Sequence, residues 1–123
     1  MILPDTSVWV DHIHHGDPDL EQLLADEQIC VHPSVVGEIA LGSMRNWEAV
    51  ITRLTVLPQV RRAADHAIVT MIRTHRLQGS GIGYVDAHLL ASCLQGEDTY
   101  LWTRDRRLAM AASRLGIDAG LSR

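Results

Sequence analysis

The sequence predicts a three-layer α/β/α fold, in which helices flank both faces of a central parallel sheet. Short apolar segments alternate with amphipathic helical segments along the whole chain of 123 residues, a pattern typical of parallel strands joined by crossover helices. Apolar residues make up 46% of the chain, which is enough to form a core without disulfides. No linker or repeat divides the sequence, so we expect one domain over residues 1–123.

The first half of the chain is expected to contribute three strands and four helices. Residues 2–5 form an apolar strand that stops at a helix start, Asp5-Thr6-Ser7. The helix that follows runs to the loop at 16–18, and a second helix covers 17–27, with three leucines on one face. Residues 29–31 form another short strand. A helix is then expected from Pro33 and Ser34 to about Met44, another over 47–54, and a short strand at 56–57.

The second half contains the longest expected helix, residues 60–77, because its apolar residues recur at helical spacing and form one stripe. A glycine-rich loop covers 78–83. A helix at 84–95, an apolar strand at 99–103 and a helix at 105–115 follow. Residues 117–119 are expected as a last strand at the edge of the sheet.

Charge and composition exclude several classes of protein. The net charge is −4, which argues against nucleic-acid binding by bulk electrostatics. All eleven basic residues are arginine, and arginine suits local, bidentate phosphate contacts. The absence of lysine excludes P-loop NTPases, Schiff-base enzymes and phosphatases that depend on a lysine.

The two cysteines and the amino terminus indicate where the protein resides. Cys30 and Cys93 lie in apolar segments, so we expect buried, reduced thiols rather than a zinc site or a disulfide framework. The sequence contains no signal peptide and no apolar stretch long enough to span a membrane. We therefore expect a cytoplasmic protein with no membrane partner.

Two acidic residues follow expected strands, at the positions where open α/β folds place their ligands. Asp5 ends the first strand, and Asp105 comes two residues after the strand at 99–103. Either residue alone is equally consistent with a helix N-cap, a position that aspartate fills well.

Two further acids lie on helix faces that should be apolar. Asp86 continues the inward stripe of its helix, because Leu89 and Leu90 follow it by three and four residues. Glu38 lies beside apolar neighbours in the same way. A carboxylate on such a face is unfavourable unless it is paired or bound to a cation. Structural salt bridges to arginine are the alternative interpretation.

The four carboxylates together indicate a metal-dependent hydrolase. Their side chains would meet at one end of the sheet, where mutual repulsion raises pKa values or recruits a divalent cation. Hard oxygen ligands suit Mg²⁺ or Mn²⁺, and such an ion can acidify a water and stabilise the leaving oxygen of a phosphodiester. Hydroxyls from Thr6, Ser7 and Thr103 lie near the same strand ends.

The neighbourhoods of these acids resemble the PIN-domain pattern. The similar segments are 5–9 (DTSVW), 35–39 (VVGEI), 83–91 (GYVDAHLLA) and 103–105 (TRD). Their order, their spacing and the chain length resemble the VapC toxins of bacterial VapBC toxin–antitoxin pairs, and the match covers nearly the whole chain. The resemblance implies a homodimeric endoribonuclease that requires Mg²⁺ or Mn²⁺, hydrolyses RNA phosphodiester bonds, inhibits translation and is neutralised by a VapB-type antitoxin.

The resemblance also assigns roles to individual residues. The metal and its water would be held by Asp5, Glu38, Asp86 and Asp105. Thr6 and Thr103 would support the site by hydrogen bonding. RNA phosphates would be contacted by Arg104, Arg106 and Arg107, which are otherwise explained as the solvated start of a helix.

Two other functions and one partner surface complete these expectations. A related nuclease could cut DNA with similar acids, and a non-catalytic module could use the same fold for binding alone. Apolar residues around Met44 and Trp47 recur at helical spacing. Some of them would form core, and others would line a groove for an antitoxin helix or a second copy of the chain.

Overall fold

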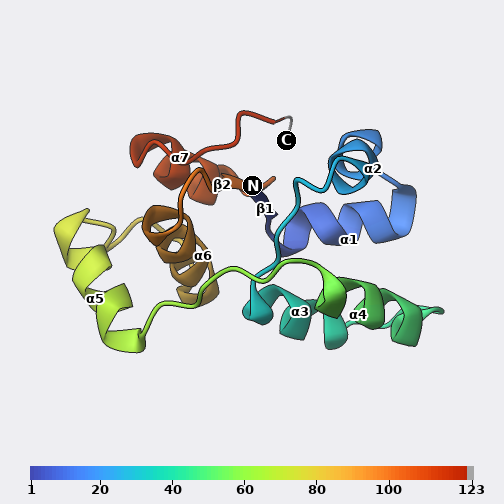
Figure 1. Cartoon of the computed structure of the whole chain (residues 1–123). Helices are drawn as coiled ribbons and strands as arrows, with labels where there is room; N and C mark the ends of the chain where they lie inside the picture. Colours follow the sequence, from blue (N-terminus) through green and yellow to red (C-terminus); the bar gives the residue numbers. More distant parts are fainter. Residues whose placement is uncertain (122–123) are drawn as a thin grey trace.

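The computed structural model describes residues 1–121, so the last two residues of the expected domain lie outside the described part. Its elements in chain order are β1 (Ile2–Pro4), α1 (Thr6–His15), α2 (Pro18–Ala25), α3 (Pro33–Ala40), α4 (Trp47–Val56), α5 (Asp65–Thr74), α6 (Tyr84–Gln95), β2 (Tyr100–Trp102) and α7 (Arg106–Arg114). The strands lie between a group formed by α5, α6 and α7 and a group formed by α1 to α4 (Figure 1). The expected α/β architecture is therefore confirmed.

The sheet is parallel and is centred on β1 and β2. Leu3 pairs with Leu101, and single parallel bridges join further segments to both edges. These bridges are Ile2–Ile29, Val31–Gln59 and Leu101–Asp118. The segments at 29–31 and 117–119 therefore join the sheet as expected, although each forms only single bridges. The expected strand at 56–57 is wrong, because α4 includes Val56 and the pairing residue is Gln59.

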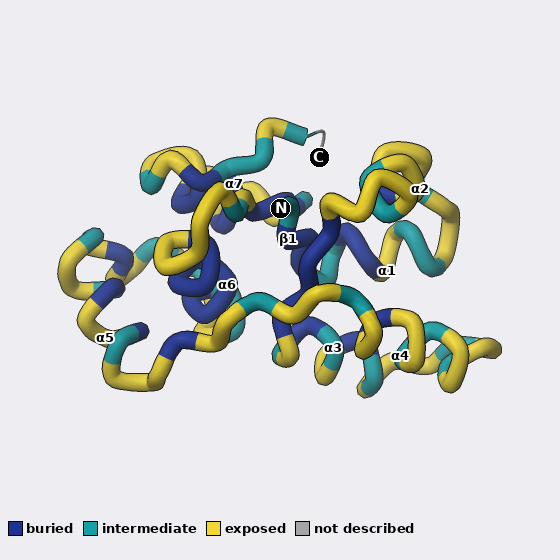
Figure 2. Tube along the Cα trace, viewed as in Figure 1, coloured by how far each residue is buried: buried dark blue, intermediate teal, exposed yellow. Residues whose placement is uncertain are grey.

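The core lies where α6 packs on the two strands. Leu3, Leu89, Leu90, Leu101 and Trp102 are each at most 1% exposed. In Figure 2, α6 and the strand region are largely dark blue, whereas the outer turns of the peripheral helices are yellow. Because α6 is covered along most of its length, seven consecutive residues from Ala87 to Cys93 are buried, and Asp86 in its first turn is only half-buried.

The helix expected over 60–77 is shorter at both ends, because α5 spans only Asp65–Thr74, and it is therefore not longer than α6 as expected. The backbone groups of the preceding residues form hydrogen bonds with other parts of the protein. The Val60 N–H donates to the Val31 carbonyl at 2.9 Å, and the Arg61 carbonyl accepts from Ser92 and Gln95 side chains of α6 at 2.8 and 2.7 Å. Tertiary hydrogen bonds thus replace the helical ones that the apolar spacing suggested.

The helix expected to reach Met44 is also shorter, because α3 ends at Ala40. The Ala40 carbonyl accepts the indole N–H of Trp47 at 2.9 Å. This bond helps hold the end of α3 against the start of α4. A side-chain donor in this way satisfies one of the carbonyls that a helix leaves unpaired at its carboxyl end.

Two expectations from composition concern the thiols and the membrane. Cys30 and Cys93 are free and buried, and burial raises their pKa values to about 11 and about 12. Both thiols therefore stay protonated near neutral pH. Within residues 1–121, none of the helices combines the length and the hydropathy needed to cross a membrane.

Candidate active site

Asp5 lies where β1 ends and α1 begins, and its carboxylate is held from three sides. Oδ1 accepts the Val8 N–H at 3.2 Å, which caps α1, and the Ser7 hydroxyl at 2.5 Å. Oδ2 accepts the hydroxyl of Thr103. The residue is 5% exposed. Burial raises the pKa of Asp5 above its ordinary value, although these hydrogen bonds oppose the shift.

Asp105 is positioned by the end of the neighbouring strand. Thr103, the residue after β2, is 2% exposed. Its oxygen accepts the Asp105 N–H at 3.0 Å while its hydroxyl donates to Asp5. Asp105 then caps α7, since its Oδ1 accepts the Leu108 N–H at 3.0 Å. Capping engages one carboxylate oxygen, so a cap and a ligand role for Asp105 are compatible.

Glu38 comes from α3 and meets Thr6 at the start of α1. The Thr6 hydroxyl donates to Glu38 Oε1 at 2.6 Å. The sequence places Glu38 on an inward, apolar face, and this expectation is wrong, because the residue is exposed while Val35 and Ile39 of the same helix are buried. Glu38 therefore faces solvent at the mouth of the site, and Thr6 orients its carboxylate.

Asp86 lies in the first turn of α6 and is half-buried. Its Oδ2 accepts the Gly83 N–H at 3.2 Å. Partial burial raises the pKa of Asp86 above its ordinary value, and the Gly83 N–H opposes this shift. Three further carboxylates raise the pKa of Asp86 by charge repulsion, and they belong to Asp5, Glu38 and Asp105.

The four acids therefore share one electrostatic environment at the carboxyl end of the sheet. The donor set consists of carboxylate oxygens, which suits a hard divalent cation such as Mg²⁺ or Mn²⁺. Among the residues that the structure describes, no three His, Cys, Asp or Glu side chains are placed as a ready-made metal site. The chemistry of the donor set nevertheless fits a hard divalent cation, which Asp5, Glu38, Asp86 and Asp105 would hold.

The three arginines near Asp105 differ in their surroundings. The Arg104 guanidinium pairs with Asp17 and, at 3.2 Å, with Asp11, and it lies 5.6 Å from the Trp102 ring centroid. These contacts anchor the end of β2 to α1 and α2. Arg106 and Arg107 are exposed at the start of α7. Of the three arginines expected to contact RNA, Arg104 is thus engaged within the protein.

The apolar residues expected to form a partner groove divide into two sets. Trp47 is half-buried and donates to Ala40, and Met44 is partly buried against the core, so neither residue lines the groove that the structure contains. This groove of about 540 Å³ lies between α1, α2 and α4 and includes Val50 and Leu54 of the same apolar set. Its apolar lining comes from Trp9, Ile13, Leu24, Val50, Val56, Leu54 and Leu57.

A comparison with protein families identifies this arrangement. The PIN domain model matches residues 2–113, which include all four acids. The chain belongs to the PIN-domain family. Two curated relatives named ribonuclease VapC32, from Mycobacterium tuberculosis strains CDC 1551 / Oshkosh and ATCC 25618 / H37Rv, are each 39% identical over 117 residues. These residues span 95% of this chain and 94% of each relative.

Within this PIN domain, Ser7 has a supporting position that the sequence did not assign, although its hydroxyl was expected near the strand ends. Ser7 donates to Asp5, and its oxygen accepts the Arg104 N–H at 3.2 Å. Ser7 therefore links the two strand ends, whereas the adjacent Thr6 serves Glu38. The signal was present in the Asp5-Thr6-Ser7 run, because consecutive residues at a helix start point in different directions and reach different partners.

Proposed function

We propose that this PIN domain is an endoribonuclease toxin that requires Mg²⁺ or Mn²⁺, inhibits translation by hydrolysing RNA and is neutralised by a VapB-type antitoxin. The observation that carries the proposal is the convergence of four carboxylates at one end of the sheet, where Thr103 links Asp5 to Asp105 and the charges of the other three acids reach Asp86. Such an arrangement is unfavourable in the protein alone and becomes favourable when a cation is bound. The name and the high coverage of the VapC32 relatives support RNA as the substrate.

The proposed mechanism assigns each acid a distinct task. Asp5 and Asp105 are held by backbone caps and by Thr103, so they would supply fixed metal ligands. Asp86 and Glu38 are held by fewer bonds and would close on the cation from the helix side. When bound, the cation supplies Lewis acidity and lowers the pKa of water. Arg106 and Arg107 are the arginines free to contact RNA phosphates.

Metal dependence and substrate class can be tested with one preparation. The protein is incubated with single-stranded RNA and with DNA of the same sequence, in Mg²⁺, in Mn²⁺ and in EDTA. RNA cleavage that stops in EDTA and returns with Mn²⁺ is the expected result. Turnover in EDTA contradicts the metal mechanism, preferential DNA cleavage indicates a DNA-cutting relative, and no cleavage under any condition indicates a binding module.

The antitoxin is proposed to use both the groove and the acids. An apolar helix would fill the groove between α1, α2 and α4. A basic side chain from the same segment would then enter among the carboxylates and compete with the metal.

Two valines allow the groove to be tested. Val50 lines it, whereas Val69 lies on α5 and is 50% exposed. Val50→Asp should weaken antitoxin binding by at least ~1 kcal/mol, since it places a charge against an apolar helix, and Val69→Asp should not. Titration calorimetry measures the affinity of each variant for the antitoxin. An RNA cleavage assay of each free variant checks its activity. Equal affinity for the two variants contradicts the groove assignment. The homodimer that we propose is checked by sedimentation.

A further inference from the structure

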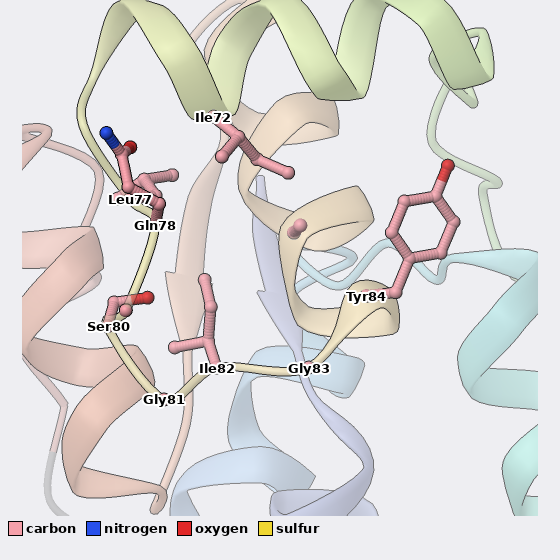
Figure 3. Close-up of a pocket in the computed structure, with 10 residues that line it drawn as sticks. Ile72, Leu77, Gln78, Ser80, Gly81, Ile82, Gly83 and Tyr84 are labelled. Carbon is pink, nitrogen blue, oxygen red and sulfur yellow. The ribbon is translucent and has the colours of Figure 1, made fainter.

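A small hollow lies beside the carboxylates on the side of α6. It occupies about 240 Å³ between α5, the loop at 78–83 and the first turns of α6. Ile72 of α5 and Ile82 of the loop contribute apolar walls (Figure 3), and Ala87 of α6 also lines the hollow. Ser80 is a half-exposed residue whose hydroxyl oxygen turns toward this space. The hollow is therefore a slot with apolar walls and a polar rim formed by the loop.

The slot is joined directly to the active site through Gly83. This glycine lines the slot, and its N–H donates to Asp86 Oδ2 at 3.2 Å. Tyr84, the next residue, directs its ring away from the slot, since its hydroxyl donates to Asp65 at 3.0 Å. A group bound in the slot would lie within one residue of the backbone that positions Asp86.

A cation lies on the other side of the same loop. Arg107 crosses Gly81 so closely that a Cβ built on this glycine would meet Arg107 Cδ and Nη1, each at 2.8 Å. Gly81 also has a φ of +85°, which favours glycine. Within residues 1–121, the three ion pairs involve Arg104 and His88 but not Arg107. The loop thus places an uncommitted guanidinium beside the slot.

We propose that the slot receives the base of the nucleotide adjacent to the scissile phosphate, with Ser80 contacting the base edge and Arg107 the neighbouring phosphate. This inference rests on the proposed ribonuclease function. Proteins read single-stranded RNA by inserting unstacked bases between side chains and hydrogen bonding to their edges. The volume of about 240 Å³ suits one base and is too small for a dinucleotide. The slot makes this enzyme selective for one base beside the cut.

Variants separate base reading from phosphate contact. The wild type and variants cleave a pool of randomised RNA, and the cut sites are sequenced. Ile72→Phe fills the slot and Ser80→Ala removes its hydroxyl, so both should change the base preference at one position beside the cut by roughly tenfold, the effect of ~1.4 kcal/mol. Arg107→Ala should lower cleavage of all sequences alike and leave the preference intact, because phosphate contacts carry no sequence information.

The matched control is Val69→Phe, which adds the same ring to α5 at a residue outside the slot. It should leave the preference unchanged. A wild type that cuts RNA without base preference, or variants that keep the wild-type preference, overturn the slot assignment while leaving the ribonuclease function standing. A wild type that cleaves no RNA in Mn²⁺ contradicts the proposed function instead.

A binding measurement that needs no catalysis gives a second test. Each of the four ribonucleoside 5′-monophosphates is titrated into the metal-free Asp86→Asn protein, and amide shifts are followed by NMR. One nucleotide should shift the amides of residues 79–83 at least ~10-fold more tightly than the weakest, and Ser80→Ala should remove that difference. Equal affinities for all four contradict base reading. Shifts caused by an antitoxin peptide but by no nucleotide would assign the slot to the protein partner.

Discussion

Asp5 and Asp86 carry the same side chain at the same end of the sheet, yet the protein holds them by different means. Asp5 is 5% exposed and accepts hydrogen bonds from Ser7, Val8 and Thr103. Asp86 is half-buried and accepts one bond, from Gly83. Both pKa values are raised, but burial is the main cause at Asp5, whereas at Asp86 the charges of the other acids add to burial.

Of the two proposed metal ligands, Asp5 therefore also supports the fold, whereas Asp86 contributes little to it. Removing Asp5 removes a helix cap and leaves the buried Thr103 hydroxyl without its acceptor, so the fold should suffer. Removing the charge of Asp86 relieves a repulsion and breaks one exposed hydrogen bond. The two acids should therefore be equivalent in catalysis and unequal in stability.

The largest expected effect is on catalysis. Asp86→Asn should lower RNA cleavage by at least ~10²-fold, because a neutral amide is a poor ligand for the proposed cation. The fold should remain intact, as checked by circular dichroism. Asp19→Asn is the matched control, since Asp19 is an exposed acid of α2 away from the site. Residual activity near that of the wild type would remove Asp86 from the active site.

Metal-linked stability should show the next largest effect. If the acids repel one another without a cation, Mn²⁺ should stabilise the wild type by ~2.7 kcal/mol at 100 times its Kd. Asp86→Asn should lose most of that gain. Thermal unfolding with and without Mn²⁺ measures the difference for both proteins. A similar gain in the two proteins would mean that the ion binds without Asp86.

Alanine substitutions compare the two positions without a metal. In EDTA, Asp5→Ala should lower the free energy of unfolding by about 1–3 kcal/mol, since the cap and the acceptor of Thr103 are both lost. Asp86→Ala should change it by less than ~0.5 kcal/mol, or raise it. Urea denaturation of the two variants gives both values. Equal destabilisation would mean that Asp86 also has a structural role.

The same comparison explains what could be predicted from the sequence. Asp5 and Asp105 were placed by a rule that depends only on chain order, because residues after parallel strands meet at one edge of the sheet. Helical spacing placed Asp86 correctly at the inward edge of α6, but it wrongly buried Glu38. Helical spacing shows which side chains share a face of a helix. It does not show which residues of that face are buried and which are exposed to solvent.

Errors in the elements have a related physical cause. The apolar stripe of α5 suggested a helix from residue 60, but Val60 and Arg61 bond to Val31 and to side chains of α6. Similarly, α3 was expected to reach Met44, but it ends at Ala40, whose carbonyl accepts the Trp47 indole N–H. In both cases a hydrogen bond from outside the helix accompanies the change in local structure. The bonds to Arg61 join residues that are 31 and 34 positions apart, so local patterns carry no signal of them.

The smallest expected effect concerns pH and salt in the metal-free protein. The folded-state pKa of Asp86 is raised above its ordinary value of 3.8, so the folded protein binds this proton more tightly than the unfolded chain does. The resulting stability is present below the ordinary pKa and is lost as the pH rises through the raised folded value. The Asp86→Asn variant has no carboxyl group at this position, so it does not lose this stability as the pH rises. Its stability advantage over the wild type should therefore grow from about pH 4 to about pH 7.

Salt should then distinguish the two causes of the raised pKa values. Repulsion from the other acids contributes at Asp86, and added salt screens such repulsion, so the advantage of Asp86→Asn should shrink between about 0.05 and about 0.5 M NaCl. Burial dominates at Asp5, so the pH dependence that persists in Asp86→Asn should respond little to salt. Thermal unfolding across this grid of pH and salt measures both effects. If salt leaves the advantage of Asp86→Asn unchanged, burial alone raises the pKa of Asp86 and the four acids do not act as one cluster.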